Sequence, residues 1–323
     1  MAQRNIVVCM DGTGNEFGRN ITNVVETYLL AQKDETQLVY YDPGVGTGGY
    51  LYDENAGTLK AAYDKATGTG VHKNVEQAYR FLMDTYEEGD RVYLFGFSRG
   101  AFSARSLAGM LHKIGLLPRD HQNQLEYASK YYLDRSYHDT AVAYRDKFCR
   151  HCPVHFVGVW DTVESTLLHE GAKFTDTRLN PEVKFAYHAV AIDERRKDFP
   201  VCLWDETDLS PGQTMQQVWF AGVHSDVGGW YDERDLSSIA LTWMAKKAMG
   251  AGMRIDADEL ARVEAQRKPV GTIHKSYTGF WKFRGSRRRK VPAGASIHRS
   301  VVERMEAVEK YTPDLPPDKT IVD

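Results

Sequence analysis

Cysteine is scarce in this 323-residue chain, and its net charge is small. Four cysteines are too few for a disulfide framework at this length, so we expect a reducing compartment. A net charge of −3 argues against nucleic-acid binding. No apolar run approaches the ~20 residues of a membrane span, and the N-terminus shows no signal-peptide pattern. We therefore expect a protein that is cytoplasmic as synthesised, with signal-independent export and the oligomeric state left open.

Hydrophobic residues make up 42% of the chain and charged residues 26%, which is ordinary for a globular domain. We expect a single α/β domain over residues 1–323. Nearly continuous apolar runs, typical of buried parallel strands, lie at Ile6–Met10, Leu38–Tyr41, Val92–Phe95, Val154–Trp160 and Val218–Val223. Helical spacing is found at 75–82, 104–111, 183–190 and 301–308. This alternation predicts a mostly parallel, doubly wound sheet.

Two longer stretches interrupt this alternation. Residues 117–152 are polar and rich in tyrosine, and residues 162–180 follow the fourth predicted strand. Both begin near the carboxyl ends of strands, where ligands bind in such sheets. They are candidate cap or lid insertions, and the alternative that they are structural helices stays open.

The most informative motif is Gly96-Phe-Ser-Arg-Gly100. An apolar run precedes it and a helix-compatible stretch follows, which is the strand–turn–helix setting of a nucleophile elbow. In such a turn the glycines remove side chains that would collide, and the serine hydroxyl is exposed to substrate. The motif makes Ser98 the candidate nucleophile, and an ordinary glycine-rich β–α turn is the alternative.

A nucleophilic serine needs a base, and the base needs a carboxylate that fixes its tautomer. With this elbow the chain order is Ser, then Asp or Glu, then His. Asp161 and His224 each follow a predicted strand in that order, so a parallel sheet would bring them to the edge that carries Ser98. Other candidates remain open, namely Asp193, Asp205 and Asp208 for the acid and His298 for the base.

The oxyanion hole needs backbone amides near the nucleophile. The amide of Arg99 is one candidate, and the amides of Gly12 and Thr13, in the glycine-rich loop after the first strand, are others. A plain tight turn is the alternative for that loop. Asp11 and Asp226 are expected in supporting roles, with Asp226 holding its own loop or orienting the imidazole.

One basic run, Lys282-Phe-Arg-Gly-Ser-Arg-Arg-Arg-Lys290, stands beside Trp281. Four cations end it: Arg287, Arg288, Arg289 and Lys290. The run predicts peripheral contact with an anionic lipid surface, or else a solvated loop.

At several of these motifs the chain resembles the catalytic domain of the type VI secretion phospholipase effectors, a family of the α/β-hydrolase superfamily. The matching segments are Met10–Asn15, Asp42–Gly46, Gly96–Arg105, Val159–Val163, Ala191–Arg195 and Trp219–Gly229. The resemblance implies an α/β-hydrolase-like fold and acyl-ester hydrolysis, with phospholipids as the substrate of the characterised effectors.

We therefore expect a serine esterase or lipase that acts on an acyl ester or phospholipid, through a Ser-His-Asp triad and an acyl-enzyme, without a cofactor or metal. Two alternatives stay open. One is a catalytically silent binding or regulatory module on the same fold. The other is a metal-dependent phosphohydrolase that uses Asp11, Asp161, His224 and Asp226 as ligands, although it leaves the elbow unexplained.

Overall fold

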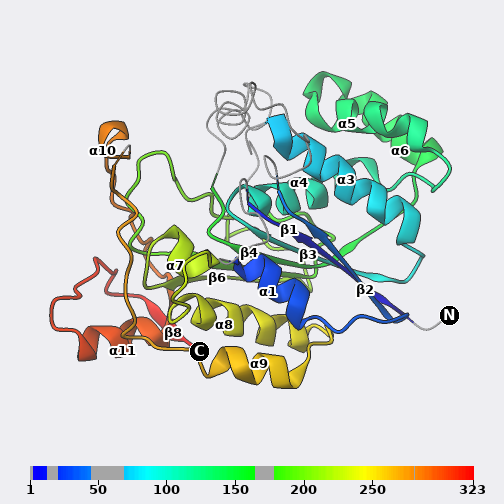
Figure 1. The fold of residues 1–323 in the computed structure, drawn as a ribbon. Coiled ribbons are helices and arrows are strands. Elements are labelled where there is room, and N and C mark those ends of the chain that lie inside the picture. Colours follow the sequence, from blue (N-terminus) through cyan, green and yellow to red (C-terminus); the bar gives the residue numbers. More distant parts are fainter. Residues whose placement is uncertain (1–2, 13–20, 45–68, 164–177, 280) are drawn as a thin grey trace, which may run out of the picture.

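The structure, a computed structural model, describes residues 3–12, 21–44, 69–163, 178–279 and 281–323 (Figure 1). Within these ranges eight parallel strands form one sheet in the order β2-β1-β3-β4-β5-β6-β7-β8. Their bounds are β1 (Asn5–Met10), β2 (Gln37–Asp42), β3 (Arg91–Phe97), β4 (Val154–Trp160), β5 (Phe185–Ala191), β6 (Thr214–Phe220), β7 (Ser296–His298) and β8 (Thr320–Val322). The predicted fold class, a parallel α/β-hydrolase-like sheet, is confirmed.

The chain changes direction across the sheet between β1 and β3. The first connection runs from β1 out to β2, and every later strand is added on the other side, beyond β3. Such a switch point opens a crevice at the carboxyl ends of its two strands, where open α/β sheets bind ligands. The loop after β1 and the turn after β3 both lie at this crevice.

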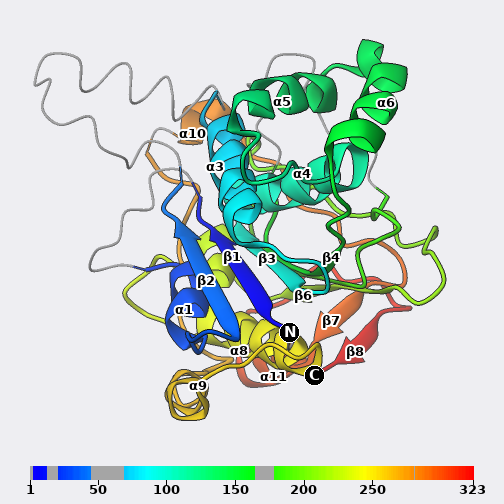
Figure 2. The same cartoon turned by 90° about the vertical axis from the view of Figure 1, so that its right-hand side faces the viewer.

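Helices cover both faces of the sheet (Figure 2). One face carries α3 (Thr69–Thr85), α4 (Arg99–Ile114), α5 (Leu125–Leu133) and α6 (His138–Phe148). The other carries α1 (Asn23–Leu30), α7 (His224–Gly228), α8 (Ser237–Gly250) and α9 (Ala257–Glu264). Along β1, alternate side chains enter the two cores: Ile6 and Val8 face α3 and α4, whereas Val7 and Cys9 face α1 and α8. Burial on both faces explains the continuous apolar runs of the strands.

Two short helices lie in the last part of the chain, α10 (Trp281–Arg284) and α11 (Arg299–Ala307). The spacing at 301–308 correctly indicated α11. In the described ranges, no helix is both long and apolar enough to cross a membrane.

One predicted helix is wrong. The spacing at 183–190 indicated a helix, but the structure places β5 there, between β4 and β6. Phe185-Ala-Tyr-His-Ala-Val-Ala191 is apolar at nearly every position, and a run buried on both sides satisfies helical and strand periodicity alike. The last predicted strand also differs, because β6 ends at Phe220 and a short turn leads into α7.

Of the two candidate cap segments, the structure describes 117–152 throughout and 162–180 only at its two ends. Residues 117–152 contain α5, α6 and the 3-10 turns Gln122–Gln124 and Arg135–Tyr137. In Figure 1 these helices pack on the outside of α3 and α4. Of the segment 162–180, residues 164–177 lie outside the described ranges.

Candidate active site

The turn between β3 and α4 holds Ser98 in an unusual backbone conformation. Its φ is 58° and its ψ is −123°, a region that costs a non-glycine residue about 1–3 kcal/mol. Its amide donates to the carbonyl of Trp160 on neighbouring β4 at 3.0 Å. Ser98 is the N-cap of α4, yet its hydroxyl makes no capping hydrogen bond. The strand–turn–helix setting predicted for the elbow is therefore present.

Close backbone approach explains both glycines of the elbow. A Cβ on Gly96 would lie 2.4 Å from the carbonyl oxygen of Gly100. A Cβ on Gly100 would lie 2.2 Å from the carbonyl oxygen of Met10 at the end of β1. The first turn of α4 is thus pressed against the end of β1, which brings the loop after β1 close to the elbow.

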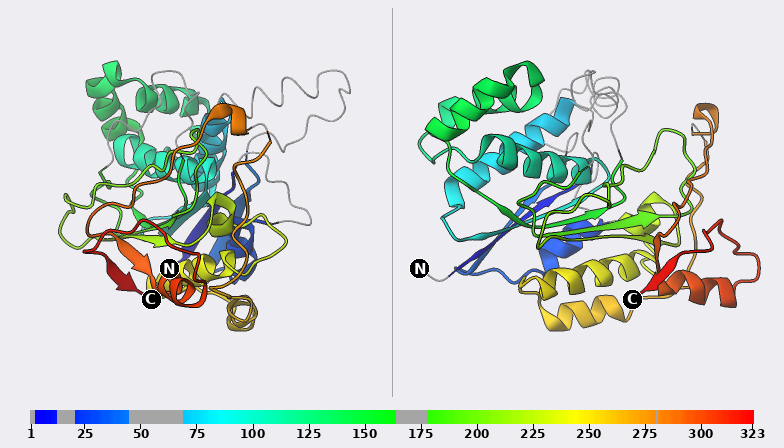
Figure 3. Two further views of the ribbon diagram at one scale, coloured as in Figure 1. Left: turned by 90° about the vertical axis from the view of Figure 1, so that its left-hand side faces the viewer. Right: turned by 180° about the vertical axis from the view of Figure 1, so that it is seen from behind.

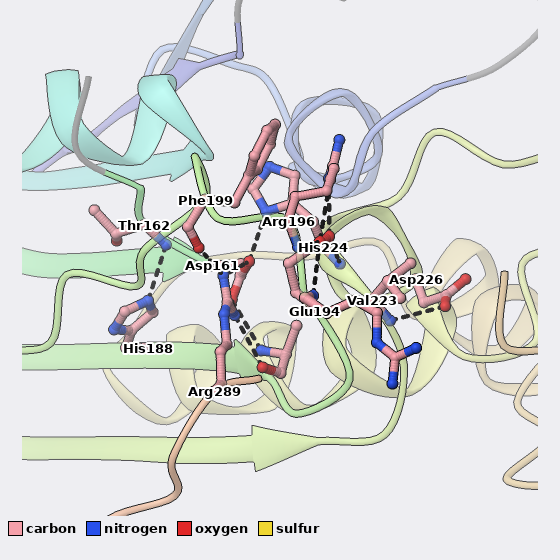
Figure 4. Close-up of polar contacts among 12 residues, drawn as sticks. Asp161, Thr162, His188, Glu194, Arg196, Phe199, Val223, His224, Asp226 and Arg289 are labelled. Atoms are coloured by element: carbon pink, nitrogen blue, oxygen red, sulfur yellow. Dashed lines mark hydrogen bonds and ion pairs between the residues drawn. The ribbon is translucent and has the colours of Figure 1, made fainter. Parts of the chain in front are cut away.

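Asp161 and His224 meet directly at this edge of the sheet (Figure 4). Asp161 follows β4 and His224 begins α7, and the distance from His224 Nδ1 to Asp161 Oδ2 is 2.5 Å. Both side chains are buried, with 5% of His224 and none of Asp161 exposed. Because an ionised carboxylate only accepts hydrogen bonds, Nδ1 carries the proton and Nε2 keeps its lone pair. That tautomer is the one a general base requires.

Asp161 is held by more than the imidazole. Arg289 reaches it from the C-terminal part of the chain, with Nη1 2.5 Å from Oδ1 and Nη2 2.9 Å from Oδ2. The amide of Ala191 also donates to Oδ1 at 2.9 Å. Burial raises the pKa of Asp161, but the charge of Arg289 and the hydrogen bond with His224 outweigh it, so the pKa falls below its ordinary value. Asp161 is a carboxylate at neutral pH.

The ring of His224 lies between two aromatic side chains. Its centroid is 4.5 Å from that of Phe97, the residue before Ser98, and 5.0 Å from that of Phe199. Burial lowers the pKa of His224, and the hydrogen bond that its Nδ1 donates to Asp161 opposes this only in part. The imidazole is therefore neutral at pH 7. Phe97 packs so closely that a Cβ on Gly228, at the end of α7, would lie 2.0 Å from its ring.

None of the rival residues contacts the His224 ring in the described hydrogen bonds. Asp193 accepts from the Gly222 amide and the Tyr311 hydroxyl, at 2.7 and 2.9 Å. Asp205 caps its own turn, and Asp208 faces Arg178 at 3.8 Å. His298 lies at the start of α11, where its Nδ1 is 2.8 Å from the Ser300 hydroxyl. Of the acids considered, Asp161 is the one that reaches the imidazole.

Glu194 is a site residue that the sequence did not indicate. Its side chain is fully buried, and it accepts the amide of His224 at 3.2 Å. Arg196 pairs with it at 2.8 Å. Burial raises the pKa of Glu194, but Arg196 outweighs it and lowers the pKa to about 2. Glu194 thus fixes the start of α7, on which the position of the imidazole depends.

Asp226 holds its own loop. Its Oδ2 accepts the amides of Val223 and His274, at 2.9 and 3.1 Å. Its Oδ1 lies 2.6 Å from the Nδ1 of His274. These contacts fit the loop-supporting role, one of the two expectations for this residue, because they close α7 against the segment around residue 274.

The loop after β1 is organised by Asp11. Its carboxylate accepts the hydroxyls of Thr22 and Tyr41, at 2.7 and 3.1 Å, and the amide of Gly12 at 2.7 Å. The Gly12 amide, a candidate oxyanion donor, thus already donates its hydrogen bond to Asp11. Thr13 lies outside the described ranges. The Arg99 amide stands at the first position of α4, where amides point out of the helix end.

The structure corrects the prediction for Arg289. It was grouped with Arg287, Arg288 and Lys290 as a lipid contact, and those three residues are exposed. The side chain of Arg289 is instead 5% exposed and turned toward Asp161. Nothing in the sequence signals this, because the two residues are 128 positions apart.

A second missed residue, His188 on β5, supports the turn that follows β4. Its Nε2 accepts the amide of Thr162 at 3.0 Å (Figure 4), and its Nδ1 is 3.2 Å from Gln217 Oε1. Burial lowers the pKa of His188 to about 3, so the ring stays neutral and its Nε2 remains an acceptor. Within the described part of the chain, no group of three His, Cys, Asp or Glu side chains is placed to hold a metal ion.

The parallel sheet and the elbow, with its neighbouring Asp–His pair, define a protein of the α/β-hydrolase class. The family model described as "T6SS, Phospholipase effector Tle1-like, catalytic domain" matches residues 4–247. The chain belongs to this family.

The three similar proteins named here are longer than this chain. It is 33% identical over 217 residues to the uncharacterized protein YEL023C of Saccharomyces cerevisiae, and it spans 32% of that protein's length. The solved structure of an uncharacterized protein from Pseudomonas aeruginosa is similar, with 19% identity and a TM-score of 0.47. The match covers 82% of this chain and 48% of that one. The structure of the Tle1 effector bound to the VgrG spike from the Type 6 secretion system is also similar, with 18% identity and a TM-score of 0.39. The match covers 71% of this chain and 51% of that one.

Proposed function

We propose that this protein hydrolyses carboxylic esters of lipids, phospholipids in particular, with Ser98, His224 and Asp161 as its catalytic triad. The observation that carries the proposal is the buried Asp161–His224 pair, 2.5 Å apart, at the sheet edge where the Ser98 elbow lies. Membership of a family of phospholipase catalytic domains supports a lipid substrate.

The reaction follows from the protonation states of the two groups, an ionised Asp161 and a neutral His224. Ser98 Oγ attacks the acyl carbonyl while His224 Nε2 takes its proton, and Asp161 stabilises the imidazolium that forms. The imidazolium then gives the proton to the leaving alcohol, which departs and leaves an ester of Ser98. Water, activated by the same imidazole, hydrolyses that ester and releases the acid. The Arg99 amide, at the N-terminus of α4, stabilises the oxyanion in both steps.

A fluorophosphonate probe tests the nucleophile directly. The folded protein is expected to be labelled at Ser98, and Ser98→Ala is expected to lose both the label and about 10⁴-fold or more of fatty-acid release from phosphatidylcholine. Ser103→Ala is the matched control, because Ser103 lies further along α4 and its hydroxyl donates to the Arg99 carbonyl at 3.1 Å. Folded wild-type protein without label would indicate a binding module instead. Activity that survives Ser98→Ala but not a chelator would indicate a metal-dependent hydrolase.

A further inference from the structure

Residues 281–288, here called the arm, project from the body of the molecule (Figure 3). The arm begins with α10, and Phe283 on this helix is 90% exposed. No other large hydrophobic side chain in the described ranges exceeds 55%. A phenyl ring held this far out in water is suited to insertion into an apolar phase.

The arm is also strongly basic. Lys282, Arg287 and Arg288 are exposed, as is Lys290 two positions after the arm, and no acidic residue occurs between 281 and 290. This contrasts with the chain as a whole, whose net charge is −3. A projecting tip with one apolar side chain among cations matches the boundary between headgroup phosphates and acyl chains. Nucleic acid fits less well, because this short run is the concentrated basic stretch of a chain whose acidic residues outnumber its basic ones.

The arm is fixed to the loop that covers the candidate base. Residues 196 and 286 form an antiparallel bridge, and the Arg287 amide donates to the Arg195 carbonyl at 2.8 Å. The ring of Trp281 lies 5.2 Å from that of Phe199, which also contacts the ring of His224 and lies under the guanidinium of Arg196. The contacts therefore run from the arm to the imidazole through a single side chain, and a surface bound by the arm would face the carboxyl edge of the sheet.

We propose that the arm docks the protein on bilayers that contain anionic lipid, with Phe283 among the acyl chains and Lys282, Arg287, Arg288 and Lys290 against the phosphates. The proposal deepens the proposed function, since docking beside the triad is useful only if the substrate is a lipid ester. Docking needs no turnover, however, so binding and hydrolysis are measured separately.

Co-sedimentation tests the proposal with two kinds of vesicle, pure phosphatidylcholine and phosphatidylcholine mixed with phosphatidylglycerol. The wild type is expected to bind the mixed vesicles and to be released by salt. Phe283→Ala is expected to weaken binding about tenfold or more, and the double variant Arg287→Glu, Arg288→Glu at least as much. Phe148→Ala is the matched control, because Phe148 is a half-exposed phenylalanine on α6, and it is expected to bind as the wild type does.

Phe283→Trp supplies a direct readout by difference: the chain already has six tryptophans, so its emission is compared with that of the wild type, and the added emission is expected to shift to the blue when mixed vesicles are added. Equal wild-type binding to both kinds of vesicle, or arm variants that bind as the wild type does, would overturn the proposal and leave the triad standing. Ser98→Ala is expected to bind vesicles normally. Vesicle binding lost in the arm variants, together with no labelling of Ser98, would support docking and refute the triad.

Discussion

Replacing Arg289 by glutamine removes the cation that is enclosed against Asp161. The Asp161 side chain is fully buried and that of Arg289 is 5% exposed, so water cannot take over the lost interaction. Breaking a buried pair of this kind costs about 3–5 kcal/mol, because one charge is left uncompensated. We expect Arg289→Gln to lower the free energy of unfolding at pH 7 by about this amount. Arg289→Lys, which keeps the charge but not the two-pronged geometry, should lose less.

The same substitution should raise the proton affinity of the Asp161–His224 pair. Without the cation, either the imidazole holds its proton more tightly or Asp161 itself takes one up, and both changes raise the apparent pKa of the pair. The acid limb of kcat/KM on a soluble ester is therefore expected to move to higher pH. In the wild type, the lowered pKa of Asp161 gives stability that is present above its unfolded-state pKa and lost as pH falls through the folded-state pKa. The difference in stability between the two proteins should therefore narrow in acid.

Urea unfolding followed by circular dichroism, over a series of pH values, measures the first effect, and initial rates on a short-chain ester measure the second. Arg262→Gln is the control for removing an arginine, because Arg262 pairs with Glu259 on the surface of α9 and is 66% exposed. That variant should stay within about 0.5 kcal/mol of the wild type. An Arg289→Gln protein with unchanged stability, or with an acid limb at unchanged or lower pH, would refute the reasoning.

Other predictions concern the turns of the site and the wild-type pH profile. Ser98→Gly relieves the strained turn, so its free energy of unfolding, measured with urea, should rise by about 1 kcal/mol while fluorophosphonate labelling is lost. A lower free energy of unfolding would show that the turn is not strained. Gly228→Ala places a Cβ against Phe97 and should cost about 1–3 kcal/mol, whereas Gly250→Ala, with nothing within 4 Å, should gain up to about 1 kcal/mol. Because burial lowers the pKa of His224, the acid limb of kcat/KM for the wild type should have its midpoint below pH 6.5. A midpoint above that value would show that the interaction with Asp161 outweighs the effect of burial on this pKa.

Apolar runs and glycines carried most of what the sequence could predict. The runs at Ile6–Met10 and Val154–Trp160 coincide with β1 and β4, because strands buried on both faces tolerate few polar side chains. Gly96 and Gly100 marked the elbow, since no other residue fits those close backbone contacts. Periodicity failed at 183–190, because a strand that is apolar at nearly every position shows no preferred period.

Interactions between distant segments could not be predicted in the same way. Arg289 had the composition of a solvated basic run, and only the three-dimensional path of the chain turns it toward Asp161. Glu194 and His188 likewise act on turns that precede α7 and follow β4. Each of these contacts satisfies a buried polar group, and no local spacing encodes which residue will do so.

The family match ends at residue 247, but the sheet does not. β7 and β8 continue it beyond β6, and Arg289 lies in the same later part of the chain. A fragment that stopped at the matched boundary would turn β6 into a bare edge strand, open to pairing with another chain. It would also leave Asp161 buried with no guanidinium beside it. We therefore expect a fragment that ends at residue 247 to be less stable and more prone to aggregate than the chain that keeps its last 76 residues, 248–323.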